Sequence, residues 1–384
     1  MKILALFCLL AISIACERSQ DNIEITSNSK YSLEIVDSIQ INRLISDPAI
    51  ASIHPENENL LLLADEGDKS MVLIISQNGE IVKEFEHLKE GPTSAGSLLV
   101  SANFYEDGYA VIGYGNILIF DKEFNVKKRL KIPYENASMV FMYSNHPKYI
   151  ERDGRPHLLI HYGPATEKSI IEAEFYDEYN LLALVDIENE IFETYGQFHE
   201  GSIFRSNRAF YLIQTFFETN GDQTRAIASY DTVLYTLDHR GEELKRTTVP
   251  FDEYIVFKGY SIGHAGLQEQ GNIGYSPGRV TSYLYLDGFD VITYRSGLSA
   301  ERMEQYKNPD GVGYDREAMN KVNPVKLMIL KDGKRVSDVS FLPEKISSLS
   351  ASDTKGNIWA TQNVDAMDEE PEVVTLYKLR IVQN

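Results

Sequence analysis

Residues 71–85 read MVLIISQNGEIVKEF: an apolar run, a tight polar turn at Asn78-Gly79, and a second run in which apolar and polar residues alternate. Alternating runs around a turn that tolerates positive φ are typical of a β-hairpin. One hairpin cannot bury its apolar face alone, so hairpins repeated along a chain predict a radial all-β repeat fold. The same arrangement returns at residues 117–130, 181–195, 233–247 and 325–339.

A second set of hairpin patterns alternates with the first, and together they give the number of blades. These patterns lie at residues 54–65, 103–114, 150–162, 204–216, 283–294 and 352–362. Each pair of hairpins makes one blade of four strands, A to D from the centre outward. The partner of the last hairpin is missing, and apolar segments at residues 31–41 and 373–382 take its place. Strands from both chain ends would close the ring and remove free sheet edges. The sequence therefore predicts an all-β, six-bladed β-propeller of four-stranded antiparallel blades, a single domain over residues 31–384.

The charge balance restricts the class of partner. Acidic residues outnumber basic ones by 57 to 37, which gives a formal net charge of −20. Phosphate backbones are bound by patches of lysine and arginine, so we expect no nucleic-acid partner. The acidity itself is explained by solubility.

The first fifteen residues have the features of a secretory signal peptide. Lys2 is followed by an apolar stretch over residues 3–12, too short to span a bilayer, and by small residues before Cys16. Ala15-Cys16 resembles the lipobox of bacterial lipoproteins, whose cysteine is lipidated and becomes the mature N-terminus. We expect this lipid to attach the chain to a membrane, with residues 16–30 as a polar tether. In the other interpretation, ordinary cleavage after Ala15 leaves Cys16 as a free thiol.

Further stretches carry a wider resemblance. Besides Ala15-Cys16 these are Glu90-Gly91-Pro92, the tyrosine-rich hairpin at residues 285–295 and Gly356-Asn357-Ile358-Trp359. With them, the chain resembles the six-bladed propeller lipoproteins common in Bacteroidota, which include a family of unknown function. The resemblance covers nearly the whole mature chain. It implies export and a lipid anchor in the bacterial outer membrane, leaves the periplasmic or surface orientation open, and transfers no catalytic residue.

Blade geometry predicts where a function resides. In an antiparallel blade the A–B and C–D turns lie at one end, and the B–C and D–A connections lie at the other. We expect the long segments to be B–C or D–A connections, so they should gather on one side, here called the loop-rich face. In one of them we expect a helical turn over SAERMEQY with Ser299 as its N-cap. The long segments are residues 163–179, 218–230, 251–275 and 295–324.

One glutamate falls in each D–A connection. If the register is right, these carboxylates gather at the channel mouth, where repulsion would raise their pKa values or recruit a cation. Ca²⁺ is the natural candidate for oxygen ligands, and the same residues are the candidate ligand-binding group. The alternative is that they are solvated charges in exposed loops. They are Glu90, Glu135, Glu200, Glu269 and Glu344.

Three other residues are binding candidates. Arg205 could pair with acidic groups of a ligand or with the surplus carboxylates of the chain. Tyr260 belongs to a set of loop tyrosines that serve either as contact surface or as packing. His264 follows Gly259-Tyr260-Ser261-Ile262-Gly263, which matches the nucleophile-elbow pattern of hydrolases. That pattern requires an α/β layer, and nothing nearby predicts one, so we assign no catalytic residue.

These observations favour a non-catalytic recognition module that presents its loop-rich face to a glycan or a partner protein. The alternative is a propeller hydrolase of sugars or lactones that uses a divalent cation and the D–A glutamates. A catalyst requires two or three carboxylates within reach of one substrate atom. A third interpretation is a structural subunit of an envelope complex, with its channel mouth plugged by side chains.

Overall fold

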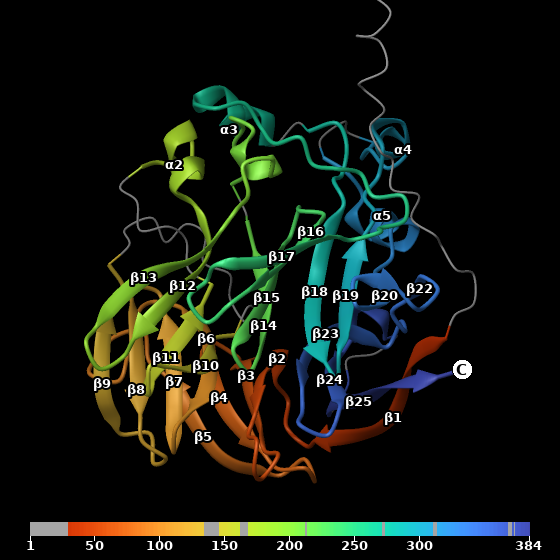
Figure 1. Ribbon diagram of the computed structural model, residues 1–384. Coiled ribbons are helices and arrows are strands. Elements are labelled where there is room, and N and C mark those ends of the chain that lie inside the picture. The colour runs from red at the N-terminus through yellow and green to blue at the C-terminus, as the bar shows by residue number, and fades with distance from the viewer. Residues whose placement is uncertain are drawn as a thin grey trace, which may run out of the picture.

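The computed structural model describes residues 30–133, 146–161, 168–211, 213–270, 273–309, 313–367, 371 and 373–384. Its strands form six separate antiparallel sheets arranged as the blades of a propeller (Figure 1). Blade 1 consists of β2 (Ser46–Ile53), β3 (Leu60–Glu66), β4 (Lys69–Ile75) and β5 (Ile81–His87). Blade 2 consists of β6 (Leu99–Tyr105), β7 (Gly108–Gly113), β8 (Asn116–Phe120) and β9 (Val126–Lys131). Blade 3 consists of β10 (Lys148–Arg152), β11 (Arg155–Ile160), β12 (Asn180–Asp186) and β13 (Ile191–Gln197).

The other three blades follow the same order, and the last one uses both ends of the chain. Blade 4 consists of β14 (Thr215–Asn220), β15 (Gln223–Ala228), β16 (Val233–Leu237) and β17 (Glu243–Thr248). Blade 5 consists of β18 (Arg279–Leu286), β19 (Phe289–Arg295), β20 (Lys326–Lys331), β21 (Lys334–Arg335) and β22 (Ser340–Phe341). Blade 6 consists of β23 (Ile346–Ser352), β24 (Asn357–Gln362), β25 (Val374–Gln383) and β1 (Tyr31–Ile41).

The first strand of each blade lines the centre of the ring. Each of these strands contacts the first strand of the next blade, and β23 returns to β2. Closure is made by β1, which pairs with β25 from Tyr31 opposite Gln383 to Ile41 opposite Val374. The six-bladed fold, the order of strands from the centre outward and the closure by both chain ends are therefore as the sequence predicts.

A turn glycine shows why the hairpin signals are specific. Gly79 connects β4 and β5 with φ +83°, and a Cβ atom added there would lie 2.0 Å from the carbonyl oxygen of Gln40. Gln40 belongs to β1, the closing strand, so this turn fits closely against the strand that completes the ring. Only glycine meets both the positive φ and the close approach.

Apolar side chains fill the spaces between adjacent blades. Leu60 and Leu62 of blade 1 pack in one cluster with Trp359 of blade 6, and each of the three is fully buried. The indole N–H of Trp359 donates to Asp353 Oδ2 at 3.3 Å, so its one polar atom is satisfied. Burial of apolar faces between neighbours is what makes each blade depend on the next.

The described helices all occur in B–C or D–A connections, and Figure 1 shows α2, α3 and α4 above the sheets. Ser299 caps α4 by accepting from the backbone N–H of Arg302, which confirms the helical turn expected there. No helix in the described ranges is long and apolar enough to cross a membrane. The elements are α2 (Ala173–Glu178), η2 (Ile203–Arg205), α3 (His264–Gln270), α4 (Ala300–Glu304), α5 (Arg316–Val322) and η3 (Val364–Ala366).

Blade 4 departs from the sequence prediction in two ways. Residues 218–230 are not a long connection, because Gly221-Asp222 is a tight turn between β14 and β15. The hairpin expected at residues 204–216 does not form in the described residues, because 204–211, 213 and 214 belong to the D–A connection that precedes β14. Its apolar residues are buried outside any sheet: Phe204 and Phe210 are each 0% exposed. Apolar residues that are buried in this connection gave the same alternating sequence pattern as the strands of a hairpin.

Candidate binding face

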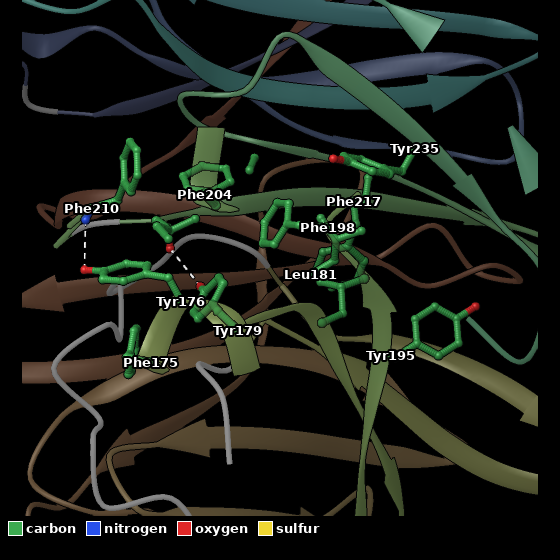
Figure 2. Packing of buried hydrophobic residues seen from close by; sticks show 14 of the residues in the cluster. Phe175, Tyr176, Tyr179, Leu181, Tyr195, Phe198, Phe204, Phe210, Phe217 and Tyr235 are labelled. Atoms are coloured by element: carbon green, nitrogen blue, oxygen red, sulfur yellow. Dashed lines mark hydrogen bonds between the residues drawn. The ribbon is translucent and has the colours of Figure 1, made fainter. Parts of the chain in front are cut away.

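An aromatic cluster anchors one sector of the loop-rich face. Figure 2 shows Phe175, Tyr176 and Tyr179, from α2 and the residue after it, packed with Phe204 and Phe210 of the next D–A connection. Tyr176 accepts from the Phe210 backbone N–H at 2.8 Å and donates to the Ile170 carbonyl at 2.7 Å. Tyr176 and Tyr179 are 2% and 0% exposed. These two loop tyrosines are therefore packing residues, and part of the high tyrosine content is structural.

Arg205 is fixed within the same sector. Its guanidinium donates from Nη1 to the Tyr176 carbonyl and from Nη2 to the Tyr179 carbonyl at 3.1 Å. These carbonyls lie at the C-terminal end of α2, where backbone oxygens lack helical partners and a cation is favourable. Burial lowers the pKa of Arg205. The structure thus gives this predicted ligand-binding arginine a role in holding α2.

The nucleophile-elbow pattern forms the turn that leads into α3. The Ser261 hydroxyl donates to Glu269 Oε1 at 2.5 Å, and its backbone N–H donates to Oε2 at 2.9 Å. These bonds lower the pKa of Glu269. His264 is exposed at the start of the helix. Tyr260 is half-buried and stacks on Tyr211 with ring centroids 5.2 Å apart. The serine is oriented toward a carboxylate of its own helix, and every described sheet is antiparallel.

The D–A glutamates are spread over different blades. Glu90 and Glu200 are exposed, in the connections before blades 2 and 4. Glu269 is held by Ser261, and Glu344 lines a cavity beside blade 6. Glu135 lies outside the described residues. Within the described ranges, no group of three or more His, Cys, Asp or Glu side chains is placed to hold a metal ion. Ca²⁺ binding by these glutamates stays a prediction.

The central channel contains a cavity of about 170 Å³ lined by the first strands of several blades. Lys148 Nζ and Glu218 Oε1 are 2.9 Å apart on its wall, with 21% and 10% of their side chains exposed. Burial raises the pKa of Glu218, and the charge of Lys148 opposes that shift. The two charges in this cavity neutralise each other.

Three cavities larger than the channel cavity lie on the loop-rich face. Residues of the B–C and D–A connections line them. The blade-6 cavity, about 380 Å³, lies between Glu344, Gln362 and Tyr377. The Phe341 cavity, about 470 Å³, includes Arg302, Asn323 and Phe341. The arginine cavity, about 210 Å³, is lined by Tyr230, Ser276, Arg279, Arg295, Asn320 and Asn323. Asn323 borders the last two cavities, so both flank the long insertion of blade 5.

From the sequence, Arg279 is grouped with Arg205 as an arginine that could pair with acidic groups of a ligand or with the surplus carboxylates, and Arg295 is not singled out. A signal was present, because the two arginines stand at the ends of one hairpin, RVTSYLYLDGFDVITYR, on either side of its Asp287-Gly288 turn. The structure pairs them directly, with Arg279 opposite Arg295 in the register of β18 and β19. Recognising that pair required the register shift between Val280 and Ser282, which alternation alone does not reveal.

Comparison with known proteins places the fold. No family model and no curated protein matches the chain. Among solved structures, it is similar to a DUF4221 family protein from Bacteroides vulgatus, with a TM-score of 0.66 and 10% identity, over 93% of this chain and 99% of that one. It is also similar to a Bacteroides fragilis protein provisionally described as exported, with a TM-score of 0.56 and 12% identity, over 94% and 97%. The chain is thus a six-bladed β-propeller that shares its arrangement with these two Bacteroides proteins over nearly their full length.

Proposed function

We propose that this chain is an exported, lipid-anchored binding protein that recognises a glycan through the loop-rich face of blades 5 and 6. The observation that carries the proposal is the asymmetry of the two faces. One face has tight turns, whereas the other carries every described helix and the three cavities. Cavities beside long connections on a rigid scaffold are where repeat folds bind their ligands.

The composition of these cavities supports a glycan over a flat protein surface. Each one combines a single aromatic ring with amides, hydroxyls or charged groups: Tyr377, Tyr230 and Phe341 are the rings. A ring provides apolar contact area, while convergent polar groups orient a ligand that has many hydroxyls. Phe341 is 63% exposed and therefore accessible to a ligand.

A glycan-binding assay with two matched variants tests this function. Purified full chain is applied to an array of neutral and acidic oligosaccharides. We expect binding to at least one class, reduced in Phe341→Ser on the loop-rich face. Val82→Ser removes an aliphatic side chain of similar exposure, 52%, beside the β4–β5 turn and should bind as the wild type does. Absence of binding to every glycan, or equal effects of both variants, would contradict the proposal.

Export and anchoring are tested separately. A similar solved structure is provisionally described as exported, and the lipobox resemblance at Ala15-Cys16 adds the anchor. In cells fed labelled palmitate, the wild-type chain should incorporate label and sediment with membranes. Cys16→Ser should lose both properties. A Cys16→Ser chain that stays labelled and membrane-bound would exclude lipidation at this cysteine.

A further inference from the structure

Arg279 and Arg295 are directly opposed across β18 and β19, at the edge of the loop-rich face. Like charges directly opposite each other in an antiparallel pair destabilise a sheet. The surroundings make this pair unusual, because carboxylates outnumber basic residues by 57 to 37 in this chain. Two arginines that face each other with no carboxylate between them repel each other, and a bound anion would remove this repulsion.

Other arginines of the same chain do have carboxylate partners. Arg225 Nη1 lies 2.8 Å from Asp290 Oδ1, and Arg152 Nη1 lies 2.8 Å from Glu193 Oε2. Neither Arg279 nor Arg295 forms an ion pair with any residue in the described ranges. The contrast is sharpest between Arg295 and Arg225, since Arg225 belongs to the neighbouring blade and both side chains are half-buried.

The pair borders a cavity that is open to solvent and suited to an anion. Arg295 is half-buried, and its Nη1 donates to the Asn323 carbonyl, which fixes the guanidinium in place. Arg279 is exposed and makes no hydrogen bond with its side chain in the described part of the chain. Burial and the charge of Arg279 together lower the pKa of Arg295. Neutral polar groups, the ring of Tyr230 and two apolar side chains form the rest of the wall: Ser276, Asn320, Asn323, Tyr230, Pro277 and Met319.

We propose that Arg279 and Arg295 together bind the acid group, a carboxylate or a sulfate, of an acidic glycan. Planar guanidinium groups present paired N–H donors that match the oxygens of such groups. The cavity of about 210 Å³ accommodates the group and its attached ring atoms beside Tyr230. This inference rests on the proposed glycan-binding function and specifies the ligand class of the same face.

Calorimetry on the purified full chain tests the proposal with three related sugars: galacturonate, galactose 6-sulfate and galactose. At low salt, at least one acidic sugar should bind about tenfold or more tightly than galactose, the size expected from a charge-assisted hydrogen bond. Arg279→Gln and Arg295→Gln should each abolish that preference, whereas Arg240→Gln, in the exposed β16–β17 turn, should keep it. The acidic sugar that binds identifies carboxylate or sulfate as the anion.

Two binding results overturn this inference while leaving the glycan-binding function intact. One is equal affinity for acidic and neutral sugars, and the other is an acid preference that survives both arginine variants. Failure to bind any glycan on the array contradicts the broader function instead. The apo protein gives an independent measurement, because Arg279→Gln removes like-charge repulsion and should raise the melting temperature by about 1–2 °C. A lower melting temperature would mean that Arg279 has a partner within the chain, and would also overturn the site.

Discussion

Lys148 and Glu218 form an ion pair inside the central channel, with Nζ and Oε1 2.9 Å apart and little of either side chain exposed. They come from the first strands of blades 3 and 4, so the pair links two neighbouring blades at the axis of the ring. Breaking a buried pair by removing one partner leaves an uncompensated charge.

Lys148→Met is therefore expected to lower the free energy of unfolding by about 3–5 kcal/mol. The double variant Lys148→Met, Glu218→Gln should recover part of this loss, because no charge then stays unpaired. Urea denaturation of the wild type, both single variants and the double variant measures the coupling. Additive single-variant effects would show that the two side chains do not interact.

Asp231 predicts a pH dependence of stability. It is 2% exposed, and burial raises its pKa from 3.8 to about 6 despite hydrogen bonds from Thr232 and Val233. A carboxyl group whose pKa is higher in the folded state stabilises the fold at pH values below its unfolded-state pKa of 3.8. This stabilisation is lost as the pH rises from there through 6. Relative to Asp231→Asn, the wild type should lose about 2 kcal/mol of unfolding free energy between pH 4 and pH 7.

The measurement is a series of denaturant titrations across that pH range. Asparagine keeps an acceptor oxygen for the Thr232 and Val233 N–H groups and cannot ionise, although its NH2 group replaces the oxygen that accepts from the Ser202 and Tyr235 hydroxyls. The change of the stability difference with pH, and not its absolute size, therefore reports the ionisation of the carboxyl group. Parallel stability curves for wild type and Asp231→Asn would contradict the pKa shift.

Arg205 should stabilise α2 rather than bind a ligand. Removing its two charge-assisted bonds in Arg205→Met should cost about 1.5–3 kcal/mol and speed hydrogen exchange across residues 173–179. Arg155→Met is a suitable control, because that side chain is 56% exposed and 3.9 Å from Asp186. If Arg205→Met left exchange in α2 unchanged while reducing glycan binding, the assignment would be reversed.

Closure by β1 should be essential for a monomeric protein. Deleting residues 31–41 removes the strand that pairs with β25 over nearly its whole length and exposes the β25 edge. An unpaired edge of this length is a template for intermolecular pairing. Size-exclusion chromatography of the shortened chain should show aggregates or oligomers. A stable monomer of normal melting temperature would mean that blade 6 does not depend on β1.

Hairpin patterns predicted most of the fold because short apolar runs mark the strands and several turns, such as those at Gly79, Gly241 and Gly333, carry a glycine at positive φ. They failed at residues 204–216, where Phe204 and Phe210 are buried in a loop cluster instead of a sheet. They also failed at residues 218–230, where Gly221 belongs to a tight hairpin turn. At residues 204–216 tertiary packing, which a single sequence does not display, decides the local structure, whereas the Gly221-Asp222 turn signal at residues 218–230 is present in the sequence and was overlooked.

The candidate site was less accessible from sequence. One-sided grouping of the long connections follows from blade topology, and so it was predicted. Arg279 and Arg295 face each other because a bulge shifts the register of β18 and β19. Arg205 binds the carbonyl groups at the end of α2, and the direction of those groups is known only from the structure. Residue type alone would rank these three arginines alike, although their surroundings give them different roles.

A crystal structure of the chain soaked with the acidic sugar that binds in solution would show directly where the acid group is bound. We expect the sugar on the loop-rich face beside blade 5, with its acid oxygens within hydrogen-bonding distance of both Arg279 and Arg295. A sugar bound at the tight-turn face, in the channel beside Lys148, or with its acid group away from both arginines would contradict this expectation.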